Sequence, residues 1–275
     1  MPGTPSARAR GITLLQEVLA TAGPIFTIEQ ARAAGETLDL SPDQVRILLS
    51  RLAQGRWLAR IKRGVYAAQS PLLGAEIHPF AVAAALVEPM AVSHWSALAY
   101  HGLTTQVPTM VQASTPRAIV APDVRGGSTY RPRGRTVWRA LDTEFEFVVV
   151  KAAHFFGLQA EWVSPWHRVD ITDPERTLLE MVAHPRIFGG IRVAIETMEA
   201  HLGRFDPGKL VAYALRYDVG SVIKRLGWIL DALGVAGIEL EPLLSYPVRN
   251  DTLLDATGPR GGATVRKWRI KNNLH

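Results

Sequence analysis

The 275-residue chain contains no cysteine, which excludes disulfide bonds, cysteine-based zinc and iron–sulfur sites, and thiol nucleophiles. It also lacks an uninterrupted apolar stretch of about 18 residues, the length that a membrane-spanning helix needs. No apolar signal-peptide segment precedes Glu17, so we expect neither secretion nor membrane insertion, and a cytoplasmic location. With 47% apolar and 20% charged residues, the chain has the composition of a folded protein, and its length favours two domains.

Positive charge is concentrated in the N-terminal quarter of the chain. Residues 1–70 hold nine Lys or Arg against five Asp or Glu, a net charge of +4, and so account for most of the net charge of +6 of the whole chain. Within this part, residues 41–70 contain the single acid Asp43. Small residues and prolines between positions 67 and 79 predict a boundary, with one domain over 1–70 and a second over 71–275. The excess of positive charge indicates an anionic partner.

The N-terminal seventy residues are predicted to form three helices and a hairpin. A helical apolar period starts at Ile12 and ends before Gly23. Thr27 and Ser41 are each followed three positions later by glutamine, the pattern of a capping box, and each predicts the start of a further helix. The run RWLARIKRGVYAA (56–68) reads as two short strands about a tight turn. Three helices followed by a basic hairpin predict a winged helix-turn-helix.

The third helix predicts a surface for DNA. Val45, Leu48, Leu49 and Leu52 share one face, which we expect to be buried, so the opposite face points outward. A helix of this kind fits the major groove, where Ile47 can contact a thymine methyl, while hairpin cations bind phosphates or the minor groove. The residues predicted to contact DNA are Arg46, Ile47, Ser50, Arg51, Gln54, Arg60, Lys62 and Arg63. The alternative interpretation is a solvated basic face, or a winged helix that contacts proteins.

Beyond residue 79 the pattern predicts a larger mixed α/β domain, which makes the whole chain α+β. Helices are expected after Pro79, Ser93, Asp173 and Asp206, because each is followed by a helical pattern. Strands are expected over residues 109–114, 117–121, 135–140 and 145–151, and a last helix over 221–234.

Two groups of residues in this domain have the form of metal sites. Asp142, Glu144 and Glu146 alternate along a predicted strand, but Phe145 between them indicates an ordinary half-buried strand with an acidic solvent side. His94 and His101 share a helix face at a spacing of seven, for which a structural role is the better interpretation. We therefore predict no metal site.

The sequence also lacks the common catalytic and nucleotide-binding motifs. It has no Walker loop, Rossmann fingerprint or Gly-x-Ser-x-Gly elbow. The run Gly126, Gly127 and Ser128 is not accompanied by the Asp-x-Asp pair that nucleotidyltransferases need, and no lysine has the carboxylate two positions earlier that a restriction-like nuclease needs. We predict no enzyme and no cofactor.

Four ordered motifs nevertheless resemble one family. They are RIKRGVY (60–66), SHWSALAYHGL (93–103), ITDPERTLLE (171–180) and KRLGWILDALG (224–234), and together they resemble the AbiEi-type antitoxins of bacterial type IV toxin-antitoxin systems. The resemblance implies an N-terminal winged helix that binds inverted repeats in its own promoter and represses the operon. It further implies a C-terminal domain that counteracts a separately encoded nucleotidyltransferase toxin.

The expected function is therefore a DNA-binding repressor that acts as an antitoxin, with double-stranded operator DNA as its partner. The alternative is a winged-helix regulator whose C-terminal domain senses a ligand and which has no toxin partner. Arg131, Arg133 and Arg135 provide either a second DNA contact or a solvated hairpin.

Overall fold

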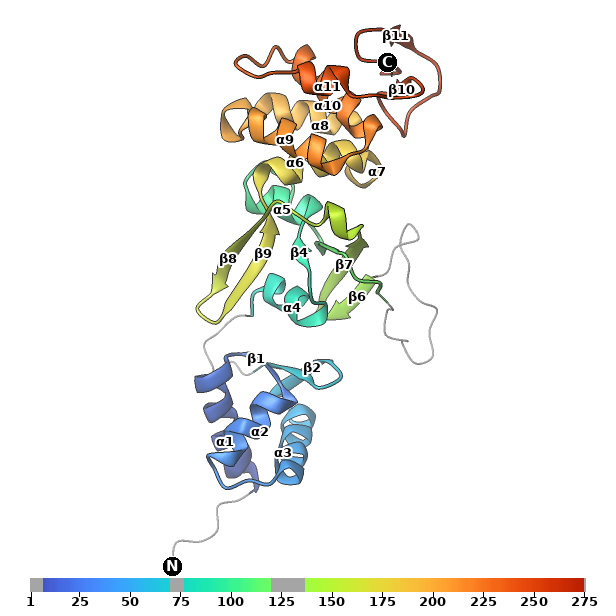
Figure 1. Cartoon of the computed structure of the whole chain (residues 1–275). Coiled ribbons are helices and arrows are strands. Elements are labelled where there is room, and N and C mark those ends of the chain that lie inside the picture. Colours follow the sequence, from blue (N-terminus) through green and yellow to red (C-terminus); the bar gives the residue numbers. More distant parts are fainter. Residues whose placement is uncertain (1–6, 70–76, 120–136, 275) are drawn as a thin grey trace, which may run out of the picture.

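The computed structural model describes residues 7–69, 77–119 and 137–274 and shows a mixed α+β protein (Figure 1). Within these residues the strands form three sheets. None of the described helices combines the length and the apolar character that crossing a bilayer requires. The predicted boundary between residues 70 and 71 lies outside the described residues.

Three helices dominate the N-terminal part: α1 (Ala7–Ala22), α2 (Ile28–Glu36) and α3 (Pro42–Gln54). Both predicted capping boxes are confirmed. The Thr27 hydroxyl accepts from the backbone N–H of Gln30 at 3.2 Å, and the Gln30 side chain accepts from the backbone N–H of Thr27 at 2.7 Å. Ser41 and Gln44 form the same reciprocal pair. These bonds satisfy amides that helix starts leave without intrahelical partners, so both helices begin where the sequence predicts.

The apolar face of α3 is buried as its spacing predicts, through Val45, Leu48, Leu49 and Leu52. These side chains share a core with residues of α1, α2 and the hairpin. In α1 the buried face is shifted from the prediction, because Leu14 is fully buried whereas Ile12 is only half-buried. One face of α3 is thus fixed inward, which leaves the other face to solvent.

A small antiparallel sheet completes this part, with strands in the order β1-β3-β2: β1 (Ile25–Thr27), β2 (Leu58–Lys62) and β3 (Val65–Ala68). The predicted hairpin is confirmed. Its two-residue turn consists of Arg63 and Gly64, and Gly64 has a φ of +77°, which glycine adopts without steric cost.

The middle of the chain forms a six-stranded sheet in the order β6-β7-β5-β4-β9-β8. Its strands are β4 (Ala91–Val92), β5 (Val111–Thr115), β6 (Val137–Ala140), β7 (Thr143–Val149), β8 (Leu158–Ser164) and β9 (His167–Thr172). Helix α4 (Pro79–Leu86) lies against this sheet (Figure 1). Its alanines and Val82 share a hydrophobic core with Phe145 and Phe147 of β7. Helix α5 (His94–Tyr100) follows β4 directly and contacts β5. The predicted strand over 117–121 is wrong where it is described, since residues 117–119 are not in a strand.

A layer of helices follows the sheet: α6 (Pro174–Ala183), α7 (Pro185–Phe188), α8 (Ile191–Ala200), α9 (Pro207–Tyr217), α10 (Gly220–Ala232) and α11 (Glu241–Ser245). Of two 3-10 turns, η3 (Ala152–His154) lies between β7 and β8, and η4 (Leu202–Arg204) lies between α8 and α9. The predicted caps at Asp173 and Asp206 are confirmed, because each carboxylate accepts from a backbone N–H of its helix's first turn. By contrast, the hydroxyl of Ser93 makes no capping bond to α5.

The C-terminal segment closes this layer with a three-stranded sheet in the order β10-β12-β11: β10 (Thr252–Leu253), β11 (Ala263–Val265) and β12 (Ile270–Asn272). Trp268 is buried in the helical core and lies so close to Gly227 of α10 that a Cβ there would come within 2.1 Å of its ring. Glycine at position 227 therefore allows α10 to pack closely against Trp268.

The N-terminal sheet packs against the rest of the molecule. Ile61 and Val65 of the hairpin share a hydrophobic core with Ala81 and Val82 of α4. At the tip of the β8–β9 hairpin, Trp166 lies over Gly23, where a Cβ would come within 2.8 Å of the Trp166 side chain. One face of the N-terminal hairpin is thus held by α4, while α3 lies away from this contact (Figure 1).

Replacing Gly23 by alanine is expected to lower the free energy of unfolding by about 2–3 kcal/mol. A φ of +81° disfavours any L-residue at this position, and the added methyl group also meets Trp166. Gly234 is a matched control, because its φ is +63° but no neighbouring atom lies within 4 Å of the position that a Cβ would take. Urea denaturation of Gly23→Ala and Gly234→Ala separates the two costs. Equal losses in both variants would contradict the Trp166 contact.

Candidate nucleic-acid interface

The exposed face of α3 carries the side chains predicted from its helical pattern. Ser50 and Gln54 are exposed, and Ile47 keeps 47% of its surface accessible although it is apolar. Arg46 and Arg51 are also exposed and stand on the flanks of this face. The structure therefore brings the five predicted helix residues together on one accessible surface.

Arg46 has an intramolecular partner on the same face. One of its guanidinium nitrogens lies 3.2 Å from the Asp43 carboxylate, and both side chains are largely exposed. An exposed pair of this kind contributes about 0–1 kcal/mol, so it leaves Arg46 available to an external acceptor. Asp43 also lies in the first turn of α3, where a carboxylate is favoured by the helix dipole.

The hairpin adds two exposed cations, Arg60 on β2 and Arg63 in the turn. Arg60 donates through Nε to the backbone oxygen of Lys62 at 3.4 Å, a long bond that keeps its guanidinium beside the turn. Both arginines belong to the predicted set of contacts, and both are accessible.

Lys62 differs from the other predicted contacts. Its ammonium donates to the backbone oxygen of Leu86 at 3.1 Å, at the end of α4, and the side chain is half-buried. Burial lowers the pKa of Lys62, and Glu88 opposes part of that effect. The hairpin's contact with α4 thus takes up the Lys62 ammonium, which sets Lys62 apart from the accessible Arg60 and Arg63.

One cation near this face was not predicted. Arg8, on the first turn of α1, lines with Arg51 a groove of about 310 Å³ between α1 and the C-terminal end of α3. The sequence signal was weak, because the apolar period that defines α1 starts only at Ile12. The second predicted DNA contact, at Arg131, Arg133 and Arg135, lies outside the described residues.

The three carboxylates that alternate in the sequence, Asp142, Glu144 and Glu146, do not come together in the structure. Asp142 precedes β7 in a left-handed conformation, with a φ of +60°, and Glu144 pairs with Arg139. Glu146 is buried and accepts from the Gln112 side chain at 2.7 Å, so the predicted solvent side is wrong at this position. Among the described residues, no three His, Asp or Glu side chains are placed to hold a metal ion.

A second polar cluster, which the sequence analysis missed, lies inside the C-terminal part. The Glu180 cluster consists of Ser93, His94, Ser114, Arg176 and Glu180, none of them more than 3% exposed. His94 Nδ1 lies 2.7 Å from the Ser93 hydroxyl, and the backbone N–H of His94 donates to Glu180 at 3.0 Å. Ser, His and Glu side chains can act together in catalysis, but these are sealed from solvent, which favours a structural role.

His101 has a different partner, the carbonyl of Thr172, so His94 and His101 do not form a pair.

His184 borders the Glu180 cluster, and its lowered pKa predicts that stability depends on pH. Burial and, to a lesser extent, His94 lower the pKa of His184 to about 4 from its usual 6.5. Below pH 6.5 the unfolded chain binds a proton that the folded protein does not bind. The free energy of unfolding is therefore expected to fall as the pH drops from about 6.5 to about 4, by up to roughly 3 kcal/mol from this group.

Urea denaturation at a series of pH values measures this effect in the wild type and in His184→Gln. The variant is expected to lose stability less steeply across the same window, because glutamine does not titrate. An unchanged slope in the variant would show that other groups cause the decline.

Comparison with protein-family models and with curated proteins gives no match. Among solved structures, the chain is similar to the RV2827C protein from Mycobacterium tuberculosis, with 16% sequence identity and a TM-score of 0.64. The similarity covers 97% of this chain and 92% of that chain. At this identity it shows a shared fold, which by itself carries no function.

Proposed function

We propose that the protein is a DNA-binding transcriptional repressor whose N-terminal part is a winged helix-turn-helix. The observation that carries the proposal is the division of α3 into a fully buried apolar face and an exposed face with Ile47, Ser50 and Gln54 between two arginines. A single helix of this kind fits the major groove, where amide and hydroxyl side chains bind base edges. In this proposal α3 is the recognition helix, and the β2–β3 hairpin is the wing.

Three of the arginines have a different task from Arg46 and the polar side chains of α3. Arg60 and Arg63 on the wing, and Arg51 on the flank of α3, bind phosphates and provide most of the sequence-independent affinity. Arg46 and the polar side chains Ser50 and Gln54 provide sequence preference. The α4 contact supports this arrangement, because it fixes the apolar side of the wing and leaves the two wing arginines accessible.

The resemblance to AbiEi-type antitoxins extends the proposal to the biological role. The protein would repress its own operon through inverted repeats and counteract a nucleotidyltransferase-like toxin. A reading frame of that kind immediately downstream, whose toxicity is relieved by this protein, is the expected finding. Its absence favours the second candidate, a regulator of the same build that senses a ligand through its C-terminal part.

Footprinting of the purified full-length protein on its own upstream DNA tests the proposal. We expect a protected segment that persists against competitor DNA and weakens as salt rises, since phosphate contacts release counterions. Both low and high salt are needed, because an affinity at one salt does not separate specific from sequence-independent binding. No protection even at low salt would refute the proposal.

A further inference from the structure

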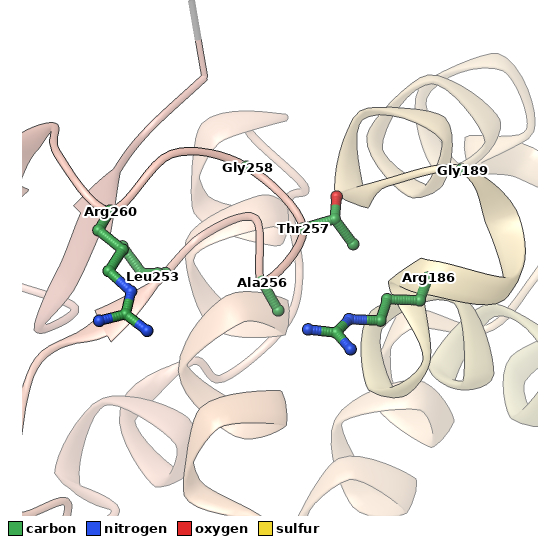
Figure 2. A pocket seen from close by; sticks show the side chains of 7 residues that line it. All are labelled: Arg186, Gly189, Leu253, Ala256, Thr257, Gly258 and Arg260. Carbon is green, nitrogen blue, oxygen red and sulfur yellow. The ribbon is translucent and has the colours of Figure 1, made fainter.

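A cavity of about 570 Å³ lies at the C-terminal end of the molecule, between α7 and the loop that joins β10 to β11 (Figure 2). Its volume is within the range of small-molecule sites. Figure 2 shows the side chains of Arg186, from α7, and Arg260, from the loop, extending from opposite sides of this space. The other lining residues are small or apolar, apart from Thr257.

The charges around this cavity are unbalanced. None of the lining residues is acidic, and both arginine side chains are exposed. The nearest acid in the loop, Asp255, is buried and its carboxylate accepts from the backbone N–H of Thr257 at 2.7 Å. Asp255 also interacts electrostatically with Arg225, a buried cation that donates to the Leu253 carbonyl. Among the described residues that line the cavity, the guanidinium groups of Arg186 and Arg260 are the only charged groups.

The loop that carries Arg260 is also held by the buried side chain of Asn273. Asn273 donates to the carbonyls of Asp255 and Pro259, at 2.9 Å and 2.7 Å, and accepts from the Asp255 backbone N–H. Gly258 faces the same amide, which a Cβ would approach to 3.0 Å. A wall held in this way is organised before any ligand arrives, which reduces the entropy cost of binding.

We propose that this cavity binds the phosphate groups of a small phosphorylated molecule, held between Arg186 and Arg260. A guanidinium matches phosphate geometry through two parallel N–H donors, and two of them facing one space suit a phosphate or diphosphate. Aromatic side chains are absent from the lining, so no platform for stacking a nucleic-acid base is present there. The elements beside the cavity, α7 and β10, lie at the end of the molecule away from α3, which favours a free ligand over the DNA proposed to bind that helix (Figure 1).

Isothermal titration of the full-length protein with pyrophosphate tests this site. Arg186→Ala and Arg260→Ala are each expected to weaken binding by at least about tenfold, because each removes a charged hydrogen-bonding partner. Arg186→Lys is expected to recover only part of the loss, since lysine lacks the paired donors. The matched control is Arg249→Ala, which removes an exposed arginine outside the cavity and is expected to leave pyrophosphate affinity unchanged.

Three outcomes would overturn the proposal: no pyrophosphate binding, binding that both cavity variants retain, or equal weakening by the control. Thermal melting of each variant verifies its folding, which substitution of an exposed side chain is expected to preserve. Duplex DNA binding by the Arg186→Ala and Arg260→Ala double variant distinguishes the source of the phosphate. Normal DNA binding is expected, whereas a loss of DNA binding without any pyrophosphate binding would assign the arginines to a nucleic-acid backbone and refute the small ligand. Because these variants leave α3 intact, failure here does not depend on the proposed function.

Discussion

Replacing Glu180 by alanine is expected to lower the free energy of unfolding by about 3–5 kcal/mol. This loss is a large part of the total free energy of unfolding of a typical single domain. Glu180 is fully buried, and its carboxylate lies 3.4 Å from the Arg176 guanidinium. It also accepts from the His94 backbone N–H, so it joins α5 to α6. Without it, Arg176 would remain a buried cation whose described neighbours are the His154 carbonyl and the rings of Phe156 and Tyr217.

Urea denaturation of Glu180→Ala beside two further variants tests this explanation. Glu199→Ala removes an exposed acid on α8 and is expected to change stability by less than about 0.5 kcal/mol. A double variant, Arg176→Met with Glu180→Leu, removes both charges and is expected to recover much of the loss, because no unpaired charge remains. If the double variant were less stable than Glu180→Ala, the loss would arise from packing and not from the stranded charge.

Removing both wing arginines is expected to have the largest effect on DNA binding. The double variant Arg60→Ala with Arg63→Ala should weaken binding to any duplex by about 10–100-fold at low salt, because two phosphate contacts are lost. The slope of log affinity against log salt should become shallower by about two, since each contact contributes about 0.9. Fluorescence anisotropy with a labelled duplex across a series of salt concentrations measures both quantities.

The control for this prediction carries the same change in net charge at the other end of the chain. Arg249 and Arg266 are exposed, and the double alanine variant at these positions should retain the wild-type slope. A third variant, Lys62→Ala, is expected to leave the slope unchanged, because the Lys62 ammonium already binds the Leu86 carbonyl. A shallower slope in the control would show that total charge, and not the wing, determines binding.

Features with a local cause were predictable from the sequence. The helix starts at Thr27, Ser41, Asp173 and Asp206 depend on side chains within three residues of the backbone that they cap. The buried face of α3 depends on helical period alone, so its exposed face was predictable with it.

Features that depend on distant segments were not predictable in this way. Lys62 was placed with the wing cations because its neighbours in sequence are basic, yet its partner belongs to α4, 24 residues further on. Glu146 fits the alternation of a half-buried strand, but β7 is an interior strand and its partner Gln112 comes from β5. In both cases the structure replaces solvent with a polar partner that only the tertiary fold provides.

The Glu180 cluster was also not predictable, because segments that are distant in the sequence come together to form it. Its members come from two of the motifs that carry the family resemblance, 93–103 and 171–180, together with Ser114 of β5. Taken singly, each of these two motifs predicted only the start of a helix, after Ser93 and after Asp173. Arg176 and Glu180 did carry a signal, because opposite charges at i and i+4 can pair, and the buried positions around them on α6 are largely apolar.

The most direct test of the central claim is the ratio of affinities for the upstream site and a scrambled duplex of equal length, measured at one salt concentration. If the exposed face of α3 reads the sequence, Gln54→Ala and Arg46→Ala should each lower this ratio by about 5–100-fold while binding to the scrambled duplex changes little. Arg249→Ala should leave it at the wild-type value. An unchanged ratio in all three variants, with tight binding retained, would show that another surface recognises the DNA.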